Sequence, residues 1–263
     1  MKKIIVGILT AAIAASLFAG CGKKEESLNS LDSVKKAGKL VIGLEDSYPP
    51  MEFRNAKNEL MGFDIELGDE VAKKLGVKAE YVNTDFNGII LALNASKFDM
   101  ILSGMSITDK RKEAIDFSEP YVMGGQVIAI KKGNAAITKA EDLKGKVVAC
   151  QLGSIGDNVA SAMKELKDVK KYDKITEAFQ ELSAGRVDAV IMDAQVGGYY
   201  TTQKPGEYEV LNKVISEEPM GMGFKKSDKE LKAAVDKAID ELKKDGTLSK
   251  LSVKWFGFDA YKK

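Results

Sequence analysis

Arg111 lies where a positive charge is unfavourable unless it binds an anion. The segment Ser103 to Arg111 follows the apolar run Met100 to Leu102, and Thr108 has the residue type and position of a helix N-cap. Arg111 would then fall in the first helical turn, where the helix macrodipole disfavours a cation and free backbone N–H groups attract an anion. A small carboxylate would fit between them. The alternative is an exposed Arg on a capped surface helix.

A second candidate residue, Asp193, comes from an internal similarity. The segment Leu93 to Leu102 aligns with Leu182 to Ile191, and each predicts a helix end, a tight turn and a buried strand. Any strand–helix–strand unit can produce this pattern, but a true repeat would mean two similar lobes. Gly104 and Asp193 would then follow the carboxyl ends of their strands, where open α/β sheets bind ligands. Facing lobes would bring Arg111 opposite Asp193, a pair that suits a zwitterion.

The elements that would position these residues alternate between short apolar runs and amphipathic stretches. Strands are expected at 40–44, 78–82, 98–102, 126–131, 146–151 and 187–192, and helices at 64–75, 87–95, 157–166, 176–184 and 229–244. The sequence therefore predicts an α/β fold with mainly parallel sheets. Cys150 falls within an expected strand and is interpreted as a small core residue.

The composition limits the chemistry. The 40 Lys and Arg residues nearly balance the 39 Asp and Glu residues, so no nucleic-acid partner is expected. His is absent, which excludes catalytic triads and zinc sites built on imidazole. We predict no metal, no other cofactor and no catalytic residue.

The N-terminus predicts export. Lys2 and Lys3 precede an apolar run from Ile4 to Ala19, as in a signal peptide over residues 1–20. The following Gly20-Cys21 completes a sequence that resembles the lipoprotein cleavage site, in which Cys21 would carry lipid and hold the protein at the outer face of a membrane. Residues 21–30 would form a polar linker. The alternative is an ordinary secretory signal.

A series of short motifs runs in one order from about Lys39 to Gly257: Leu40-Val41-Ile42-Gly43, Tyr48-Pro49-Pro50-Met51-Glu52-Phe53, Gly62-Phe63-Asp64, Asp85-Phe86-Asn87-Gly88, Ser103 to Arg111, Asp116 to Tyr121, Asp142 to Lys146 and Lys254-Trp255-Phe256-Gly257. Together they resemble the polar amino-acid-binding proteins of ATP-driven importers, family 3 of the bacterial solute-binding proteins. The resemblance implies a two-lobed periplasmic-binding-protein fold of type II, a free L-amino acid as ligand and an ABC-transporter permease as partner. We expect a monomer.

The family's fold implies two hinge crossings, near Met123 to Gln126 and near Glu218 to Gly223. Lobe 1 would comprise residues 31–124 and 222–263, and lobe 2 residues 125–221. Glycines at both crossings suit a backbone that must rotate as the lobes close.

The resemblance also implies which residues bind the ligand: Glu45, Tyr48, Phe86, Ser103, Gly104, Ser106, Arg111, Gln151, Ser154, Ile155 and Asp193. Arg111 would bind the α-carboxylate, helped by the Ser106 hydroxyl and by the loop Gly153 to Gly156, which can also be read as a plain helix cap. Asp193 would bind the α-ammonium together with the Gly104 carbonyl. Tyr48 and Phe86 would enclose the ligand side chain.

Glu45 would contact the far end of that side chain. A carboxylate there favours a cationic or donor-rich ligand, so Arg, Lys or ornithine is expected first and Gln second. Asp46 could replace Glu45 if the strand ends one residue later, and Gln151 can donate or accept. A dehydratase acting on cyclic acids, like cyclohexadienyl dehydratase, would need Glu45 or Asp193 as its general acid. A sensor or adhesin would have the same pocket.

Overall fold

The computed structural model describes residues 29–211 and 214–262. The predicted signal peptide, the lipidation site at Cys21 and the linker up to residue 28 lie outside the described residues. Helix α1 (Ser30–Ala37) begins directly after its N-cap Asn29, so the last residue of the predicted linker, Ser30, is already part of a helix. Within the described ranges no helix is both long and apolar enough to cross a membrane.

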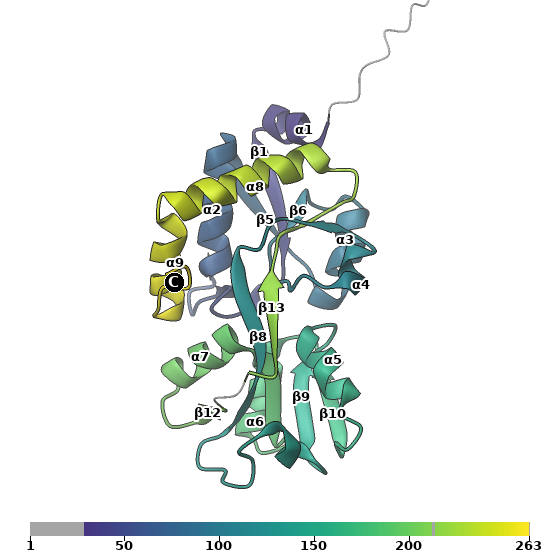
Figure 1. Cartoon of the computed structure of the whole chain (residues 1–263), viewed down its shortest axis with the longest axis vertical. Helices are drawn as coiled ribbons and strands as arrows, with labels where there is room; N and C mark the ends of the chain where they lie inside the picture. The colour runs from purple at the N-terminus through teal and green to yellow at the C-terminus, as the bar shows by residue number, and fades with distance from the viewer. Residues whose placement is uncertain (1–28, 212–213, 263) are drawn as a thin grey trace, which may run out of the picture.

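The chain forms two α/β lobes, the first above the second in Figure 1. The first lobe is built on a five-stranded sheet in the order β5 (Lys78–Asn83), β1 (Lys39–Leu44), β6 (Met100–Ile101), β14 (Gly223–Phe224) and β7 (Asp116–Phe117). A small antiparallel sheet adds β2 (Ser47–Tyr48), β3 (Glu52–Arg54) and β4 (Leu60–Met61). Its further helices are α2 (Phe63–Leu75), the 3-10 turn η1 (Phe86–Gly88), α3 (Ile89–Asn94), α4 (Asp109–Lys112), α8 (Lys229–Lys244) and α9 (Thr247–Phe256).

The second lobe is built on a six-stranded sheet. Its strands are β10 (Asp168–Tyr172), β9 (Val147–Gln151), β11 (Ala189–Asp193), β8 (Val122–Lys131) and β12 (Tyr208–Val210) in that order, with β13 (Ser216–Met220) also paired to β8. Its helices are η2 (Ala140–Leu143), α5 (Ile155–Ala162), α6 (Ile175–Ser183) and α7 (Ala194–Gln203). Both sheets are mixed, because parallel strands lie beside antiparallel strands where the chain passes between the lobes. The predicted two-lobed α/β fold is confirmed, but the expectation of mainly parallel sheets is wrong, since β14 and β8 each run antiparallel to their neighbours.

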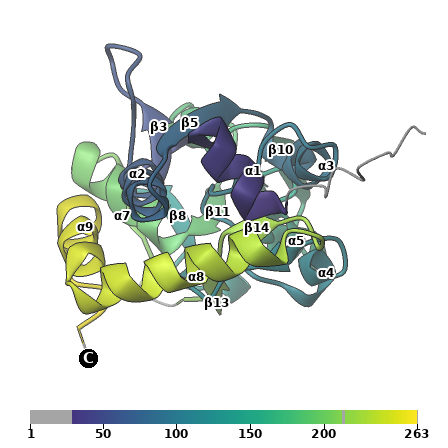
Figure 2. The ribbon, with the colours of Figure 1, turned by 90° about the horizontal axis from the view of Figure 1, so that it is seen from above.

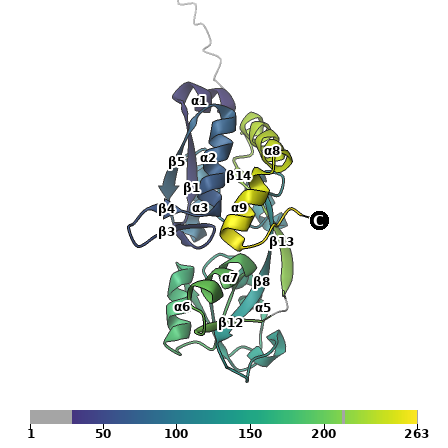
Figure 3. The same cartoon turned by 90° about the vertical axis from the view of Figure 1, so that its left-hand side faces the viewer.

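Two antiparallel strands cross between the lobes, as Figure 3 shows for β8 and β13. A side chain at Gly124 would place its Cβ 2.7 Å from the Met220 methyl, and one at Gly125 would meet the Ser216 carbonyl at 2.5 Å. These glycines therefore let the crossing strands approach closely, since neither has the positive φ that only glycine adopts easily. The two predicted crossings are confirmed, while the residue-level lobe boundaries stay a prediction.

The C-terminal segment packs on the first lobe through aromatic residues. The Phe256 ring stacks on Phe63 of α2 with centroids 4.7 Å apart, and Trp255 meets Phe53 edge-on at 6.1 Å. Figure 2 shows α8 and α9 along one flank of this lobe.

In the second lobe, Cys150 is fully buried among apolar residues, and this burial raises the pKa of its thiol to about 12. The interpretation of Cys150 as a core residue is confirmed.

The internal similarity corresponds to equivalent hydrogen bonds in the two lobes. Asp99 Oδ2 accepts a backbone N–H of β1 at 2.8 Å, and its counterpart Asp188 accepts a backbone N–H of β9 at 2.8 Å. The turns before them use left-handed residues at matching positions, Ser96 with φ 57° and Gly185 with φ 70°. Each lobe thus presents the carboxyl ends of its parallel strands to the other lobe.

The expected elements form, with four main differences in extent. The strand expected at 98–102 keeps only two residues, and the strand expected at 126–131 begins four residues earlier, as β8. The helix expected at 87–95 begins as the 3-10 turn η1, and the helix expected at 157–166 starts and ends earlier, as α5. Elements that were not predicted include the short strands β2 to β4 and helix α7. Their sequences carry little periodic signal, because β2 to β4 have two or three residues each and α7 contains Gly197 and Gly198.

Candidate functional site

A small cavity lies between the lobes and is lined by every predicted site residue except Ser103. Its walls are formed by Glu45, Tyr48, Glu52, Phe86, Gly104, Ser106, Arg111, Gln151, Ser154, Ile155 and Asp193. The cavity volume is only about 10 Å³, and hydrogen bonds from Tyr48 to Asp193 and from Gln151 to Glu45 join its two walls. A free amino acid could enter only after the lobes separate.

Strand ends position the walls of this cavity. Glu45 directly follows β1, and Gly104 follows β6 in the first lobe. Gln151 is the last residue of β9, and Asp193 the last residue of β11, in the second lobe. Because parallel strands end at the same edge of a sheet, each lobe gathers polar groups from separate strands at its inner edge.

Arg111 is held in the cavity by carbonyl groups and an aromatic ring. Thr108 caps α4 by accepting the Arg111 N–H at 3.2 Å, which confirms the predicted helix start. The Arg111 guanidinium donates to the carbonyls of Ser106 at 2.8 Å and Gly153 at 3.2 Å, and it lies 5.4 Å from the centre of the Phe86 ring.

The charge of Arg111 has no direct counterion among the residues that the structure describes. No carboxylate of residues 29–211 or 214–262 forms an ion pair with Arg111 within 4.0 Å. Burial lowers the pKa of the guanidinium, and the negative charges of Asp193 and Glu218 oppose that shift. A half-buried guanidinium without a carboxylate partner is suited to bind an external anion.

Asp193 faces the cavity from the other lobe. One carboxylate oxygen accepts the Tyr48 hydroxyl at 2.5 Å, and the other accepts the Gln126 amide at 2.8 Å. Burial raises the pKa of Asp193 to about 6, although both hydrogen bonds and the charge of Arg111 act in the opposite direction. Gln126 was not predicted as a site residue.

Glu45 supplies a second carboxylate to the cavity. It accepts the Ser47 hydroxyl at 2.6 Å and, across the lobes, the Gln151 amide at 3.3 Å. Burial raises the pKa of Glu45, while the Ser47 hydrogen bond lowers it. Asp46 instead pairs with Arg54 outside the cavity, so the alternative that placed Asp46 at this position is wrong.

The loop before α5 forms part of the second wall. Ser154 caps the helix, because its hydroxyl accepts the Asp157 N–H at 3.1 Å and donates to the Gln151 carbonyl at 2.7 Å. Gly153 has φ 76° and lies against Asn87 of the other lobe, where a Cβ would come within 2.8 Å of the amide oxygen. The loop is thus a helix cap that also carries Ser154 and Ile155 to the cavity.

Ser103 and Glu52 differ from the prediction in opposite ways. Ser103 lies behind the wall, where it accepts the Glu45 N–H at 3.1 Å and donates to Glu52 at 2.7 Å. Glu52 lines the cavity and is fully buried, but it was not predicted as a site residue. Its sequence signal was an acid enclosed between Met51 and Phe53.

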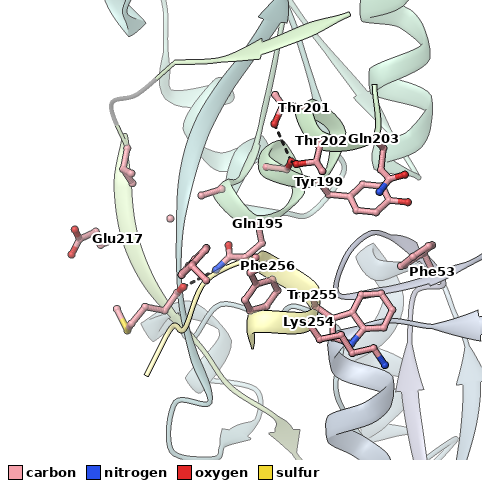
Figure 4. A pocket seen from close by; sticks show the side chains of 18 of the residues that line it. Phe53, Gln195, Tyr199, Thr201, Thr202, Gln203, Glu217, Lys254, Trp255 and Phe256 are labelled. Atoms are coloured by element: carbon pink, nitrogen blue, oxygen red, sulfur yellow. Dashed lines mark hydrogen bonds between the residues drawn. The ribbon is translucent and has the colours of Figure 1, made fainter. Parts of the chain in front are cut away.

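A wider groove of about 910 Å³ lies elsewhere, between α7 of the second lobe and α9 of the first. Figure 4 shows Trp255 and Phe256 on one side, and Tyr199 and Gln195 on the other. Its charged lining residues are Glu217 and Lys254, and its walls are otherwise mostly apolar or neutral. The smaller cavity is better suited to a zwitterion, since Arg111 and Asp193 face it from opposite sides.

Comparisons with known proteins identify the family of this chain. The model of the bacterial extracellular solute-binding proteins, family 3, matches residues 40–258. The L-cystine-binding protein TcyJ of Escherichia coli (strain K12) is 34% identical over 262 residues, which cover 99% of this chain and 97% of the relative.

Two solved structures of an ancestral arginine-binding protein, one bound to arginine and one to glutamine, are also similar. They are 45% and 46% identical with TM-scores of 0.80, and the match covers 84% of this chain and 99% and 98% of theirs. The shared two-lobed architecture is that of the type II periplasmic-binding-protein fold. The chain belongs to family 3 of the bacterial extracellular solute-binding proteins.

Proposed function

We propose that this protein captures a free cationic L-amino acid between its lobes, with arginine, lysine or ornithine as the preferred ligand, and delivers it to the permease of an ABC transporter. The protein acts as a monomer held at the outer face of a membrane by lipid on Cys21. Lobe 1 comprises residues 31–124 and 222–263, and lobe 2 comprises residues 125–221. Binding and release depend on lobe closure and opening, and no bond is broken.

The observation that carries this proposal is the placement of Arg111 and Asp193 on opposite walls of one cavity. The guanidinium is held by carbonyl oxygens and pairs with no carboxylate of the described part of the chain, so it suits the ligand α-carboxylate. Asp193 suits the α-ammonium, which would replace the Tyr48 hydroxyl as its hydrogen-bond donor. Because the two charges come from separate lobes, the ligand joins the lobes when it binds.

Glu45 selects for a ligand whose side chain carries a positive charge. A zwitterion neutralises Arg111 and Asp193, which leaves the Glu45 carboxylate without a cation inside the cavity. A guanidinium or ammonium at the end of the ligand side chain would supply that cation, whereas a ligand carboxylate would be repelled.

Glutamine is the second candidate. A neutral amide can donate a hydrogen bond to Glu45, as Gln151 does at 3.3 Å. The glutamine-bound structure of a 46% identical relative supports this candidate. The two ligands differ in charge, so the contribution of Glu45 distinguishes them.

Calorimetry against the standard amino acids and ornithine tests the proposal. Arginine-class ligands are expected to bind most tightly, with a Kd on the order of micromolar, or about −8 kcal/mol. Glu45→Gln is expected to weaken arginine binding by about tenfold or more and to change glutamine binding much less, because the lost interaction is a charge-assisted hydrogen bond. Asp46→Asn is the matched control, since Asp46 pairs with Arg54 outside the cavity.

Two results would count against the proposal. Equal losses for arginine and glutamine in Glu45→Gln would remove Glu45 as the residue that selects ligand charge. Unchanged uptake of labelled amino acid in a deletion strain without a redundant importer would remove the transport role.

A further inference from the structure

Two buried carboxyl groups, Glu52 of β3 and Asp64 of α2, come together at the wall of the cavity. Both residues are 0% exposed, and their backbones are adjacent because the Asp64 N–H donates to the Met51 carbonyl at 2.8 Å. Their side chains also bond consecutive residues, since Glu52 accepts from Ser103 and Asp64 from Gly104. Each has one oxygen without a hydrogen-bond donor, Oε2 of Glu52 and Oδ1 of Asp64. Two buried carboxylates with unsatisfied oxygens would be strongly destabilising, and one proton between those oxygens satisfies both.

Among the described residues, the titratable groups around the pair are acids and phenols. Glu45 raises the pKa of Glu52, and the Tyr121 hydroxyl lowers the pKa of Asp64 by hydrogen bonding. The charges of the pair in turn raise the pKa of Tyr48, Tyr81 and Tyr261. No Lys or Arg of residues 29–211 or 214–262 forms an ion pair with Glu52 or Asp64 within 4.0 Å. Burial raises the pKa of both carboxyl groups, and the negative charge of Asp64 raises the pKa of Glu52 further.

Hydrogen-bond donors distinguish the two members of the pair. Asp64 Oδ2 accepts two donors, the Gly104 N–H at 2.7 Å and the Tyr121 hydroxyl at 3.0 Å. Glu52 Oε1 accepts one donor, the Ser103 hydroxyl at 2.7 Å. Since each donor stabilises the charged form, the negative charge belongs on Asp64 and the proton on Glu52.

We propose that Glu52 and Asp64 share one proton, carried by Glu52 Oε2 and donated to Asp64 Oδ1, so that Glu52 lines the cavity as a neutral group. Asp64 is then a positioning residue, because its charge holds the Gly104 N–H and with it the loop that faces the ligand. Glu52 is a specificity-determining residue, because its neutrality leaves Glu45 as the one acid for the ligand side chain. This last role rests on the proposed function, whereas the shared proton does not.

Infrared spectroscopy of the ligand-free protein at about pH 8 tests the shared proton. Asp193 is ionised there, since its pKa is about 6. The wild type is expected to show the C=O stretching band of a protonated carboxylic acid, and Glu52→Gln to lose it. Asp69→Asn is the control on the same helix, because Asp69 is exposed and bonds Tyr81, so the band should persist. A wild type without the band, or a band retained in Glu52→Gln, would overturn the proposal.

Asp64→Asn tests the effect on ligand charge. Its amide oxygen can still accept from Gly104 and Tyr121 while its N–H₂ faces Glu52, so the negative charge moves to Glu52 at the cavity wall. The ratio of the glutamine Kd to the arginine Kd is expected to rise about tenfold. An unchanged ratio in a folded variant that has lost the infrared band would refute the specificity role.

The two measurements separate the possible failures. If the wild type binds no amino acid, the proposed function fails, but the infrared result still decides the shared proton. If Asp64→Asn does not fold, the wild type and Glu52→Gln spectra decide the position of the proton. The specificity role is then decided by an Asp64→Glu variant. If this variant keeps the acid band, its preference for arginine over glutamine should match the wild type. If it loses the band, that preference should change.

Discussion

The Tyr48 hydroxyl donates a hydrogen bond to the Asp193 carboxylate across the boundary between the lobes, with the two oxygens 2.5 Å apart. Tyr48 lies on β2 of the first lobe, and Asp193 ends β11 of the second. The bond thus occupies the carboxylate oxygen at which a ligand ammonium would bind.

Ligand affinity should fall in acid because Asp193 must be ionised to bind an ammonium. Burial raises the pKa of Asp193 to about 6, so the binding-competent carboxylate predominates above that pH and is lost as pH falls through it. Below about pH 6 the affinity should decrease by roughly tenfold per pH unit. Calorimetry with glutamine in a Glu45→Gln background measures this, since that background removes Glu45, another cavity-lining acid whose pKa is raised.

Asp193→Asn provides the control for this pH dependence. It should bind weakly and show little change between about pH 8 and pH 5, because no carboxylate titrates at that position. A constant affinity of the Asp193-containing protein across the same range would contradict the assigned role.

Arg111→Ala should reduce amino-acid affinity by roughly 100-fold or more, because charge-assisted hydrogen bonds to a carboxylate contribute about 1.5–3 kcal/mol each. Arg111→Lys should recover only part of this loss, since an ammonium cannot bind a carboxylate in the same bidentate way. Arg186→Ala is the matched control, because Arg186 forms an exposed pair with Glu181 at 2.6 Å. Calorimetry that finds wild-type affinity in Arg111→Ala would exclude this residue as the anchor.

Tyr199→Ala should weaken ligand binding, although Tyr199 does not line the ligand cavity. The Tyr199 ring of the second lobe packs on Phe53 of the first with centroids 5.4 Å apart, and both line the groove in Figure 4. Such a contact contributes about 0.5–1.5 kcal/mol, so the closed form should become roughly twofold to tenfold less favourable. Calorimetry gives the affinity, and small-angle X-ray scattering with ligand gives the degree of closure.

Phe258→Ala is the control for that prediction. Phe258 lines the same groove, but it is 57% exposed and its aromatic neighbour is Phe256 of its own lobe. Equal effects of the two variants would mean that the loss of groove surface, and not the contact between lobes, matters.

Gly125→Ala should destabilise the fold, because its Cβ would lie 2.5 Å from the Ser216 carbonyl on the neighbouring strand. Forcing the crossing strands apart should cost about 1–3 kcal/mol, measured by urea unfolding. Gly198→Ala in α7 is the control, since its Cβ meets no atom within 4 Å and the change should stabilise by about 0.5–1 kcal/mol. Unchanged stability of Gly125→Ala would show that the strands separate at little cost.

Local sequence patterns were sufficient for the elements that carry the site. The helix at Lys229–Lys244 has the predicted bounds, and Thr108 caps α4 as expected. These features depend on periodicity and capping within a few residues, which are properties of the chain itself. The family motifs predicted the remaining site residues, and every predicted site residue except Ser103 lines the cavity.

The site residues that were missed depend on contacts between distant segments. Gln126 bonds Asp193 only because β8 pairs with β11, and Glu52 reaches Asp64 only because β3 packs against the start of α2. Neither residue has a neighbour in the sequence that indicates such a partner.

The sequence by itself determined the main helices and strands, the family and the paired charges of Arg111 and Asp193, because residue type and spacing are enough to specify helix caps, long strands and motifs. Tertiary structure alone decided which carbonyls hold Arg111, that Tyr48 bonds Asp193 and that Glu52 meets Asp64. The physical reason is that hydrogen bonding and desolvation act over a few ångströms in space, whatever the separation along the chain.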